Sequence, residues 1–162
     1  MSLILTRIDN RLIHGQILEA WVPHLQVDCI IVANNEIAAQ TIQRTLMAAA
    51  VPKSIRVVIA SLAEVAELFS GHELDAARVL LLLANPGDAM AAYRGGIRFS
   101  ELNLGNLHCG DGKLRYSCTV ALDPVELDNL RQLEAEGVRI AARCIPSDPD
   151  RDWKKLVEGG GT

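Results

Sequence analysis

The sequence predicts an α/β fold: one domain with an open, mostly parallel β-sheet and helices on both faces. Short runs rich in Ile, Val and Leu alternate with amphipathic segments along the whole chain. Such apolar runs are typical of strands buried on both faces, and regular alternation with helices implies right-handed crossovers. The length of 162 residues suits one domain. We therefore expect a single domain over residues 1–162, with a flexible, glycine-ending tail from about 157 to 162.

Five segments carry the strand signal. Aromatic residues make up only 4% of the chain, so the core must be aliphatic, which suits parallel strands covered by helices. The same scarcity leaves few stacking platforms for single-stranded nucleic acid. The predicted strands are Leu3–Ile8, Cys29–Ala33, Ile55–Ala60, Val79–Ala84 and Val138–Ile145.

Three helices are predicted from their start signals. Ser61 with Glu64, and Asp123 with Glu126, form the capping-box pattern, in which the first side chain and the fourth bond each other's backbone N–H groups. Asn85 precedes a proline, which suits the first turn of a helix. Glycines close the first and last of these segments.

Two more helices are expected from the apolar pattern. One runs from about Asn35 to before Pro52, and a shorter one follows the first strand and is closed by Pro23. The stretch from 95 to 117 holds five glycines and no long period. It predicts short strands joined by glycine-rich turns.

Charge, cysteines and hydropathy exclude several classes of protein. A net charge of −4 argues against a duplex-binding surface, which needs clustered Lys and Arg. Cys29, Cys109, Cys118 and Cys144 are widely spaced with no C-x-x-C pair, which predicts buried, reduced thiols. The N-terminal residues show no signal-peptide pattern, and no apolar run approaches a membrane span of roughly 18 residues. Together these features predict a cytoplasmic protein.

The best candidate site lies in the first loop. In open α/β sheets, ligands bind beyond the carboxyl ends of the strands. The loop after the first predicted strand reads Arg7-Ile8-Asp9-Asn10-Arg11-Leu12-Ile13-His14-Gly15-Gln16 and leads into an apolar helix face. One His, two Arg and one Asp therefore crowd a strand-to-helix turn.

Each residue type in this loop suits phosphoryl transfer to a side chain. The positive end of a helix dipole binds phosphate and disfavours an imidazolium, so His14 can stay neutral and nucleophilic near pH 7. Arg11 can grip two phosphoryl oxygens, and Asp9 can hold either Arg11 or one imidazole nitrogen. Gly15 lets the backbone approach the phosphoryl group. The residue types alone leave a structural alternative open, in which His14 packs or caps and the Arg–Asp pairs are merely solvated.

The same ten residues resemble the phosphorylation loop of IIB components of the mannose/fructose/sorbose-type sugar phosphotransferase system (PTS). The resemblance implies that His14 is the phosphohistidine intermediate, that Arg11 stabilises the phosphate and that Asp9 orients the site. In one place the chain departs from the family: Asn106 follows Gly105, where the family has a second glycine. Further similar segments are Val32-Ala33-Asn34, Leu102-Asn103-Leu104-Gly105, and Gly137-Val138 leading to Ile145-Pro146-Ser147-Asp148.

The resemblance also implies a reaction and partners. A IIA phosphocarrier domain would donate the phosphoryl group, and the chain would pass it to a sugar during uptake through the IIC/IID membrane permease. This is a protein-Nπ-phosphohistidine–sugar phosphotransferase activity that needs no cofactor or metal. The chain would then associate with the inner face of the membrane through the permease, and homo-oligomerisation stays open. For docking of the IIA domain, we expect apolar residues near the loop, such as Leu12 or Trp21, to be partly exposed.

Other classes of function remain open at this point. One is a regulatory binding module switched by phosphorylation of His14 without sugar transfer, and another is an inert structural subunit. Neighbouring IIC and IID genes would favour transport. A zinc site at His108 and Cys109 with His24 or His72 fits no zinc-ligand spacing. Both His24 and His72 flank the ends of predicted helices and are expected at the surface. Asp111 stands where a phosphate-binding loop requires Lys.

Overall fold

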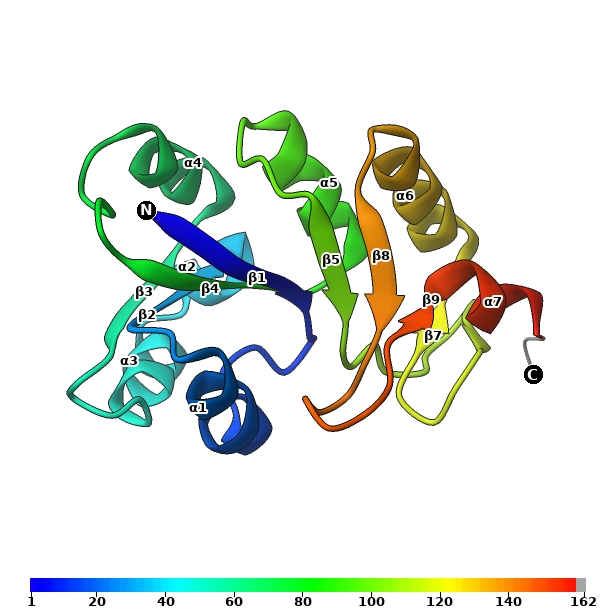
Figure 1. The fold of residues 1–162 in the computed structure, drawn as a ribbon, viewed down its shortest axis with the longest axis horizontal. Helices are drawn as coiled ribbons and strands as arrows, with labels where there is room; N and C mark the ends of the chain where they lie inside the picture. Colours follow the sequence, from blue (N-terminus) through cyan, green and yellow to red (C-terminus); the bar gives the residue numbers. More distant parts are fainter. Residues whose placement is uncertain (160–162) are drawn as a thin grey trace.

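A central, mostly parallel sheet organises the chain (Figure 1). The computed structural model describes residues 1–159, and within that range the sheet has seven strands in the order β3-β2-β4-β1-β5-β8-β9. Neighbouring strands pair in parallel except β9, which is antiparallel to β8. A small antiparallel pair, β6 and β7, lies outside this sheet. The strands are β1 Ser2–Ile8, β2 Cys29–Ala33, β3 Arg56–Ala60, β4 Arg78–Leu83, β5 Glu101–Leu104, β6 Leu114–Arg115, β7 Ala121–Leu122, β8 Arg139–Ala142 and β9 Arg151–Asp152.

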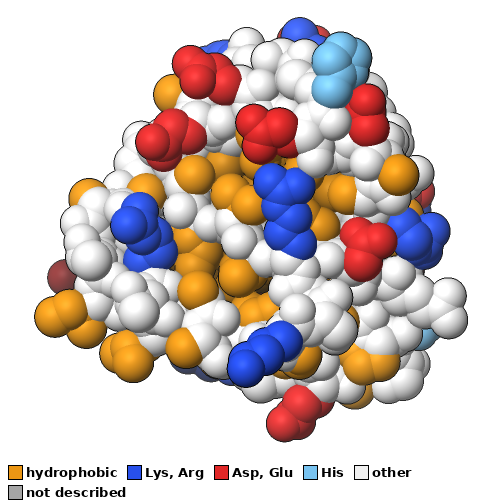
Figure 2. Space-filling view, turned by 90° about the vertical axis from the view of Figure 1, so that its left-hand side faces the viewer, with side chains coloured by type: hydrophobic (Ala, Val, Ile, Leu, Met, Phe, Trp, Pro, Cys, Tyr) orange, Lys and Arg blue, Asp and Glu red, His pale blue; other side chains and the backbone are white. Residues whose placement is uncertain are grey.

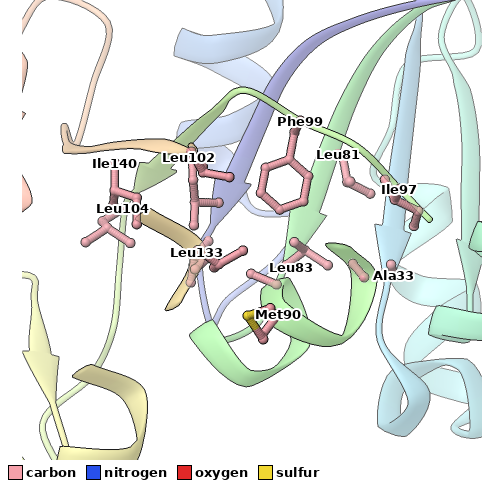
Figure 3. Packing of buried hydrophobic residues seen from close by; sticks show 14 of the residues in the cluster. Ala33, Leu81, Leu83, Met90, Ile97, Phe99, Leu102, Leu104, Leu133 and Ile140 are labelled. Atoms are coloured by element: carbon pink, nitrogen blue, oxygen red, sulfur yellow. The ribbon is translucent and has the colours of Figure 1, made fainter. Parts of the chain in front are cut away.

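Helices cover both faces of the sheet, as predicted. Alternate residues of β4 enter different core clusters: Leu81 and Leu83 pack with residues of α4, α5 and α6, whereas Leu80 and Leu82 pack with residues of η1 and α1. Figure 3 shows the first of these clusters, with Met90 of α5 and Leu133 of α6 against Leu83. The helices are η1 Ile17–Trp21 (a π-helical turn), α1 Val22–Leu25, α2 Asn35–Ala39, α3 Thr41–Ala49, α4 Leu62–Ser70, α5 Pro86–Arg94, α6 Pro124–Ala135 and α7 Trp153–Glu158.

The order of the strands determines where a site can form. From the end of β1 the chain crosses toward β2 on one side, and from the end of β5 it crosses toward β8 on the other side. The loops that leave β1 and β5 therefore diverge from a switch point at the carboxyl edge of the sheet. Such a topological switch point is where open α/β sheets bind their ligands.

The capping signals are confirmed. Both capping boxes are complete: the Ser61 and Asp123 side chains accept from the backbone N–H groups of Glu64 and Glu126, whose carboxylates accept in return. The Asn85 side chain accepts from the N–H of Asp88 at the start of α5.

Some boundaries differ from the predictions. The expected single helix from Asn35 is two helices, because the backbone of Gln40 leaves the helical region (φ −100°, ψ 88°). Pro23 does not close the first helix: η1 ends with Val22 N–H bonded to the Ile17 carbonyl, and Pro23 lies in the first turn of α1, which tolerates the missing N–H. The last predicted strand ends at Ala142.

The cysteines and the C-terminal residues also differ in part from the predictions. The prediction of four buried thiols is wrong for Cys109 and Cys118, which are exposed on the glycine-rich segment, whereas Cys29 is buried in β2. Of the tail expected from about 157, the first two residues belong to α7, and residues 160–162 lie outside the described part. No helix among residues 1–159 is both long and apolar enough to cross a membrane.

Replacing Asp123 by Ala should lower the free energy of unfolding by about 1 kcal/mol, because the first turn of α6 loses the acceptor for the Glu126 N–H. Asp123→Asn keeps an acceptor and should stay within a few tenths of a kcal/mol of the wild type. Urea unfolding followed by circular dichroism measures both. Equal losses in the two variants would mean that the cap does not stabilise α6.

Candidate functional site

Buried side chains anchor the loop that follows β1. Leu12 and Ile13 are buried in the cluster that contains Trp21, so the loop is fastened to the core immediately before His14. Leu12 has a left-handed backbone (φ 57°), which is rare for a leucine and is held here by its surroundings. The His14 carbonyl accepts from the N–H groups of Ile17 and Leu18. His14 therefore lies at the N-terminal end of the helical segment formed by η1 and α1.

The carboxylate of Asp9 is the centre of the site. Its Oδ2 atom lies 2.9 Å from Nε2 of His14 and 3.3 Å from a terminal nitrogen of Arg7. Its Oδ1 atom accepts from the backbone N–H of Arg11 at 3.1 Å and lies 3.5 Å from Nε of the same residue. The Asn106 amide donates to Oδ2 at 3.4 Å. One fully buried carboxylate thus joins the loop after β1 to the loop after β5.

Arg7 lies beneath this carboxylate and connects three strands. Its guanidinium donates to Asn103 Oδ1 on β5 and to the carbonyls of Arg143 (2.7 Å) and Cys144 (3.1 Å), which follow β8. It also lies 4.8 Å from the centre of the Trp21 ring, within the range of a cation–π contact. The Trp21 indole donates to the same Cys144 carbonyl at 3.0 Å. The ends of β1, β5 and β8 are therefore fixed relative to one another.

The absence of a side chain at Gly105 makes room for the Arg7 guanidinium. A Cβ atom at this position would overlap the Nη2, Cζ and Nε atoms of Arg7. Because Arg7 is fully buried and bonded on several sides, its guanidinium cannot move aside cheaply. The glycine is needed here for close approach rather than for an unusual backbone angle.

The pKa values follow from burial and pairing. Burial would raise the pKa of Asp9, but hydrogen bonds from His14 and the Arg11 backbone, with the charges of His14 and Arg7, outweigh it and hold that pKa below its ordinary value of 3.8. Burial lowers the pKa of Arg7, which Asp9 partly offsets; a guanidinium still keeps its proton at neutral pH. At neutral pH the site therefore holds an ionised carboxylate against a buried cation.

The structure brings the predicted site residues together. Asp9 was expected to hold either Arg11 or the imidazole, and it contacts both. Arg11 is further bonded to Gln16 Oε1 at 3.2 Å. The His14 side chain is 15% exposed, so a protein partner can reach it at the surface. Apart from its chain neighbours, no described residue has an atom within 4 Å of the point where a Cβ on Gly15 would sit, so the backbone is open at this position.

Sequence reasoning missed the roles of Arg7 and Asn106. Arg7 is a charged residue inside an apolar strand, two positions before Asp9, and that pattern is a usable signal for a buried ion pair. Asn106, the departure from the family pattern, also accepts from the Asn10 N–H at 2.9 Å through its carbonyl. The expectation that Leu12 or Trp21 is partly exposed is wrong, because both fill the core under the loop.

Other candidate side chains lie apart from these contacts. His24 and His72 are exposed, as expected, and His72 pairs with Asp75 at 3.2 Å. His108 and Cys109 are exposed on the glycine-rich segment. Within residues 1–159, no cluster of three or more His, Cys, Asp or Glu side chains could hold a metal ion.

Comparison with known proteins points to one family. The family model described as "PTS system sorbose subfamily IIB component" matches residues 3–161. The chain is 32% identical over 149 residues to the sorbose-specific EIIB component of Klebsiella pneumoniae, covering 92% of this chain and 91% of that protein. It is 30% identical to the mannose-specific EIIAB component of Escherichia coli K12, covering 97% of this chain and 49% of that protein. The chain thus spans about half the length of these mannose-specific relatives.

Solved structures agree with the fold. The IIB domain of the sorbose permease from Klebsiella pneumoniae superposes with a TM-score of 0.93 at 30% identity, covering 98% of both chains. An N-acetyl-galactosamine IIB component from Streptococcus pyogenes superposes with a TM-score of 0.90 at 28% identity, covering 97% of this chain and 98% of that one.

Gly105→Ala should lower the free energy of unfolding by about 1–3 kcal/mol, because the new methyl group would overlap the Arg7 guanidinium. The Trp21 indole N–H resonance should shift, since this ring stacks on Arg7, while the Trp153 indole provides an internal reference. Gly110→Ala is the matched control, because nothing lies within 4 Å of its added Cβ. A Gly105→Ala protein with wild-type stability and an unmoved Trp21 signal would contradict this packing.

Asp9→Asn should cost about 3–5 kcal/mol at neutral pH, because it leaves the buried Arg7 cation unpaired. The folded pKa of Asp9 lies below 3.8, so its contribution is complete above that pH and disappears as the pH falls through the folded value. The stability difference between wild type and variant should therefore be constant above about pH 5 and shrink below 3.8. Urea titrations from pH 7 to pH 2.5, roughly spanning this titration, measure it. A difference that does not change with pH would exclude the assigned ionisation.

Proposed function

Because this chain belongs to the sorbose subfamily of PTS IIB components, which transfer phosphoryl groups during sugar uptake, we propose that His14 accepts a phosphoryl group from a IIA phosphohistidine and passes it to a sugar. The observation that carries this proposal is the 2.9 Å contact between His14 Nε2 and the buried Asp9 carboxylate. An ionised carboxylate at that distance keeps the proton on Nε2. The lone pair is then on Nδ1, which is the nucleophile.

The proposed transfer has two balanced steps. In the first, the Nδ1 lone pair of His14 attacks phosphorus, a new N–P bond forms, and the N–P bond of the donor phosphohistidine breaks. In the second, a sugar hydroxyl attacks the same phosphorus, the N–P bond on His14 breaks with its electron pair returning to Nδ1, and the hydroxyl proton passes to water. Asp9 stabilises the positive charge that the imidazole ring gains while Nδ1 is phosphorylated and Nε2 keeps its proton.

Arg11 is the proposed phosphate-binding side chain. Asp9 and Gln16 contact its Nε and Nη2 atoms, which orients the guanidinium beside the loop. A side chain held this way loses less rotamer entropy when it binds phosphoryl oxygens, and it opposes the negative charge on them. His14 lies at the start of a helical segment, where the positive end of the helix dipole favours the negative charge of a phosphoryl group.

The proposed partners follow from the family. The donor is a IIA domain, and the acceptor sugar is presented by a IIC/IID membrane permease. We place the chain in the cytoplasm, at the inner face of the membrane where the permease is docked. The mannose-specific relative is named an EIIAB component, and this chain matches about half of it, which supports a IIA domain as the direct donor.

Incubation with a phosphorylated IIA domain should add one phosphoryl group to the wild-type chain, detected by intact-protein mass spectrometry. Mild acid should remove the label and base should retain it, as for a phosphoramidate rather than a serine ester. NMR with ¹⁵N-labelled histidine should locate phosphorus on Nδ1 of His14. His14→Gln should abolish the label, and His108→Gln, in the exposed glycine-rich segment, should keep it. Labelling that persists in His14→Gln would overturn the proposal.

Arg11→Lys should slow phosphoryl uptake at least tenfold, which corresponds to about 1.4 kcal/mol of lost transition-state stabilisation. Lysine keeps the charge but lacks the planar fork that contacts both Asp9 and Gln16. Urea unfolding should be nearly unchanged, because the side chain is partly exposed. Quench-flow labelling measures the rate, and Arg44→Lys on exposed α3 is the control. Equal rates for wild type and Arg11→Lys would exclude Arg11 from phosphate binding.

A further inference from the structure

The two edges of the sheet are built differently. One edge is β9, a strand of two charged residues, Arg151 and Asp152, directly followed by α7. Short length, charge and a covering helix are the devices by which proteins keep an edge strand from pairing with another chain. The other edge is β3, whose five residues read Arg-Val-Val-Ile-Ala without proline, lysine or a bulge. Within residues 1–159, β3 pairs with β2 alone.

The outer edge of β3 directs unpaired backbone groups away from the sheet. The Arg56 N–H donates to the Asp28 carbonyl at 2.9 Å, and the Ala60 carbonyl accepts from Asn34 at 3.0 Å, so both of these residues turn their backbone groups toward β2. In a parallel ladder alternate residues face the same neighbour. The residues between them, Val57 and Ile59, therefore direct their N–H and C=O groups outward.

Apolar side chains surround this edge. Val57, Val58 and Ile59 are only partly buried, whereas every residue of the neighbouring strand β2 is buried. Helix α3, which packs against β3, contributes no buried residue, and its Ile42 and Leu46, one turn apart, are 76% and 66% exposed. Figure 2 shows this end of the molecule: hydrophobic side chains gather in the middle of the face, one basic side chain crosses them beside an acidic one, and further charges of both signs lie at the periphery.

From this edge we infer that the chain forms a two-fold dimer in which β3 pairs antiparallel with β3 of a second copy, centred on Val58. Val57 of each copy then faces Ile59 of the other. These are the residues whose N–H and C=O groups point outward, so four hydrogen bonds form and none of the pairs to β2 is broken. The two sheets become one continuous sheet.

Charge and area favour a second copy as the occupant. In this arrangement the basic start of β3, with exposed Lys53 and Arg56, lies beside the other copy's α4, whose first turn carries exposed Glu64. The only charge within β3, Arg56, pairs with Glu73 of its own copy and lies opposite a small residue, Ala60. Specific interfaces bury about 1,200–2,000 Å², more than one strand supplies, and Ile42 and Leu46 of α3 provide further apolar area at the same end of the molecule.

The dimer leaves the phosphorylation loop free. Two strands, β2 and β4, separate β3 from β1, at whose carboxyl end His14 lies. Dimerisation and phosphoryl uptake can therefore be measured separately, and failure of one does not imply failure of the other.

Sedimentation equilibrium under reducing conditions should give twice the 17.6 kDa chain mass at high protein concentration. Reducing agent is needed because Cys109 and Cys118 are exposed. Val57→Pro removes one outward N–H donor from each copy and leaves the hydrogen bonds between β3 and β2 intact. Leu46→Glu places a charge on the exposed apolar side of α3. Each should raise the dimer dissociation constant at least tenfold, about 1.4 kcal/mol, while His14 labelling continues. Val125→Glu, on exposed α6, is the matched control and should dimerise like the wild type.

A cysteine pair tests the register. In a protein carrying Cys109→Ser and Cys118→Ser, Val58→Cys should form an intermolecular disulfide on mild oxidation, because residues opposite each other in a non-hydrogen-bonded pair have Cα atoms about 4.5 Å apart. Ile59→Cys should not, because its Cα atoms would be about 9 Å apart across the axis. A wild-type chain that stays monomeric at about 1 mM, or a dimer that persists in both Val57→Pro and Leu46→Glu, would overturn the inference. Selective cross-linking of Ile59→Cys would also overturn it.

Discussion

The buried ion pair between Arg7 and Asp9 is the interaction on which the rest of the site depends. Removing two charges from water costs several kcal/mol per ion, and a buried pair stabilises a fold only if its other hydrogen-bonding groups are also satisfied. Asn103 and the carbonyls of residues 143 and 144 accept from the terminal nitrogens of Arg7, and the Trp21 ring lies beside its guanidinium, whereas its buried Nε atom has no hydrogen-bond partner among the described residues. The burial of the Arg7 guanidinium thus explains three features: the glycine at 105, the buried Trp21 indole and the course of the chain after β8.

The parts of the site that are local in sequence were predictable, and the distant parts were not. Asp9, Arg11 and His14 lie within six residues of one another, so a strand-to-helix turn brings them together. Apart from Asp9, the hydrogen-bond partners of Arg7 lie 96 to 137 residues away and meet it only through the strand order. The capping boxes were predictable for the same reason, because each is completed within four residues. The helix break at Gln40 has no such local marker, and the hydrophobic periodicity continues through it.

The buried positions of Leu12 and Trp21 change the expected surface around His14. Both residues fill the core beneath the loop, so polar side chains such as Arg11 and Gln16 surround His14. An interface with a polar rim and little exposed apolar area is typical of short-lived encounters. In the proposed function the chain receives a group from one protein and delivers it to another, and such contacts would suit it because neither partner is held for long.

The three strand ends that Arg7 joins also determine how the active loop responds to fluctuations. Local opening normally begins in segments with few long-range contacts. The loop at His14 is fixed from below by Leu12 and from the side by groups on two distant strands. Amide hydrogens around Asp9 should consequently be among the slowest of the chain to exchange with solvent. In the proposed function, phosphoryl transfer would then persist for as long as the domain is folded and would be lost together with the fold.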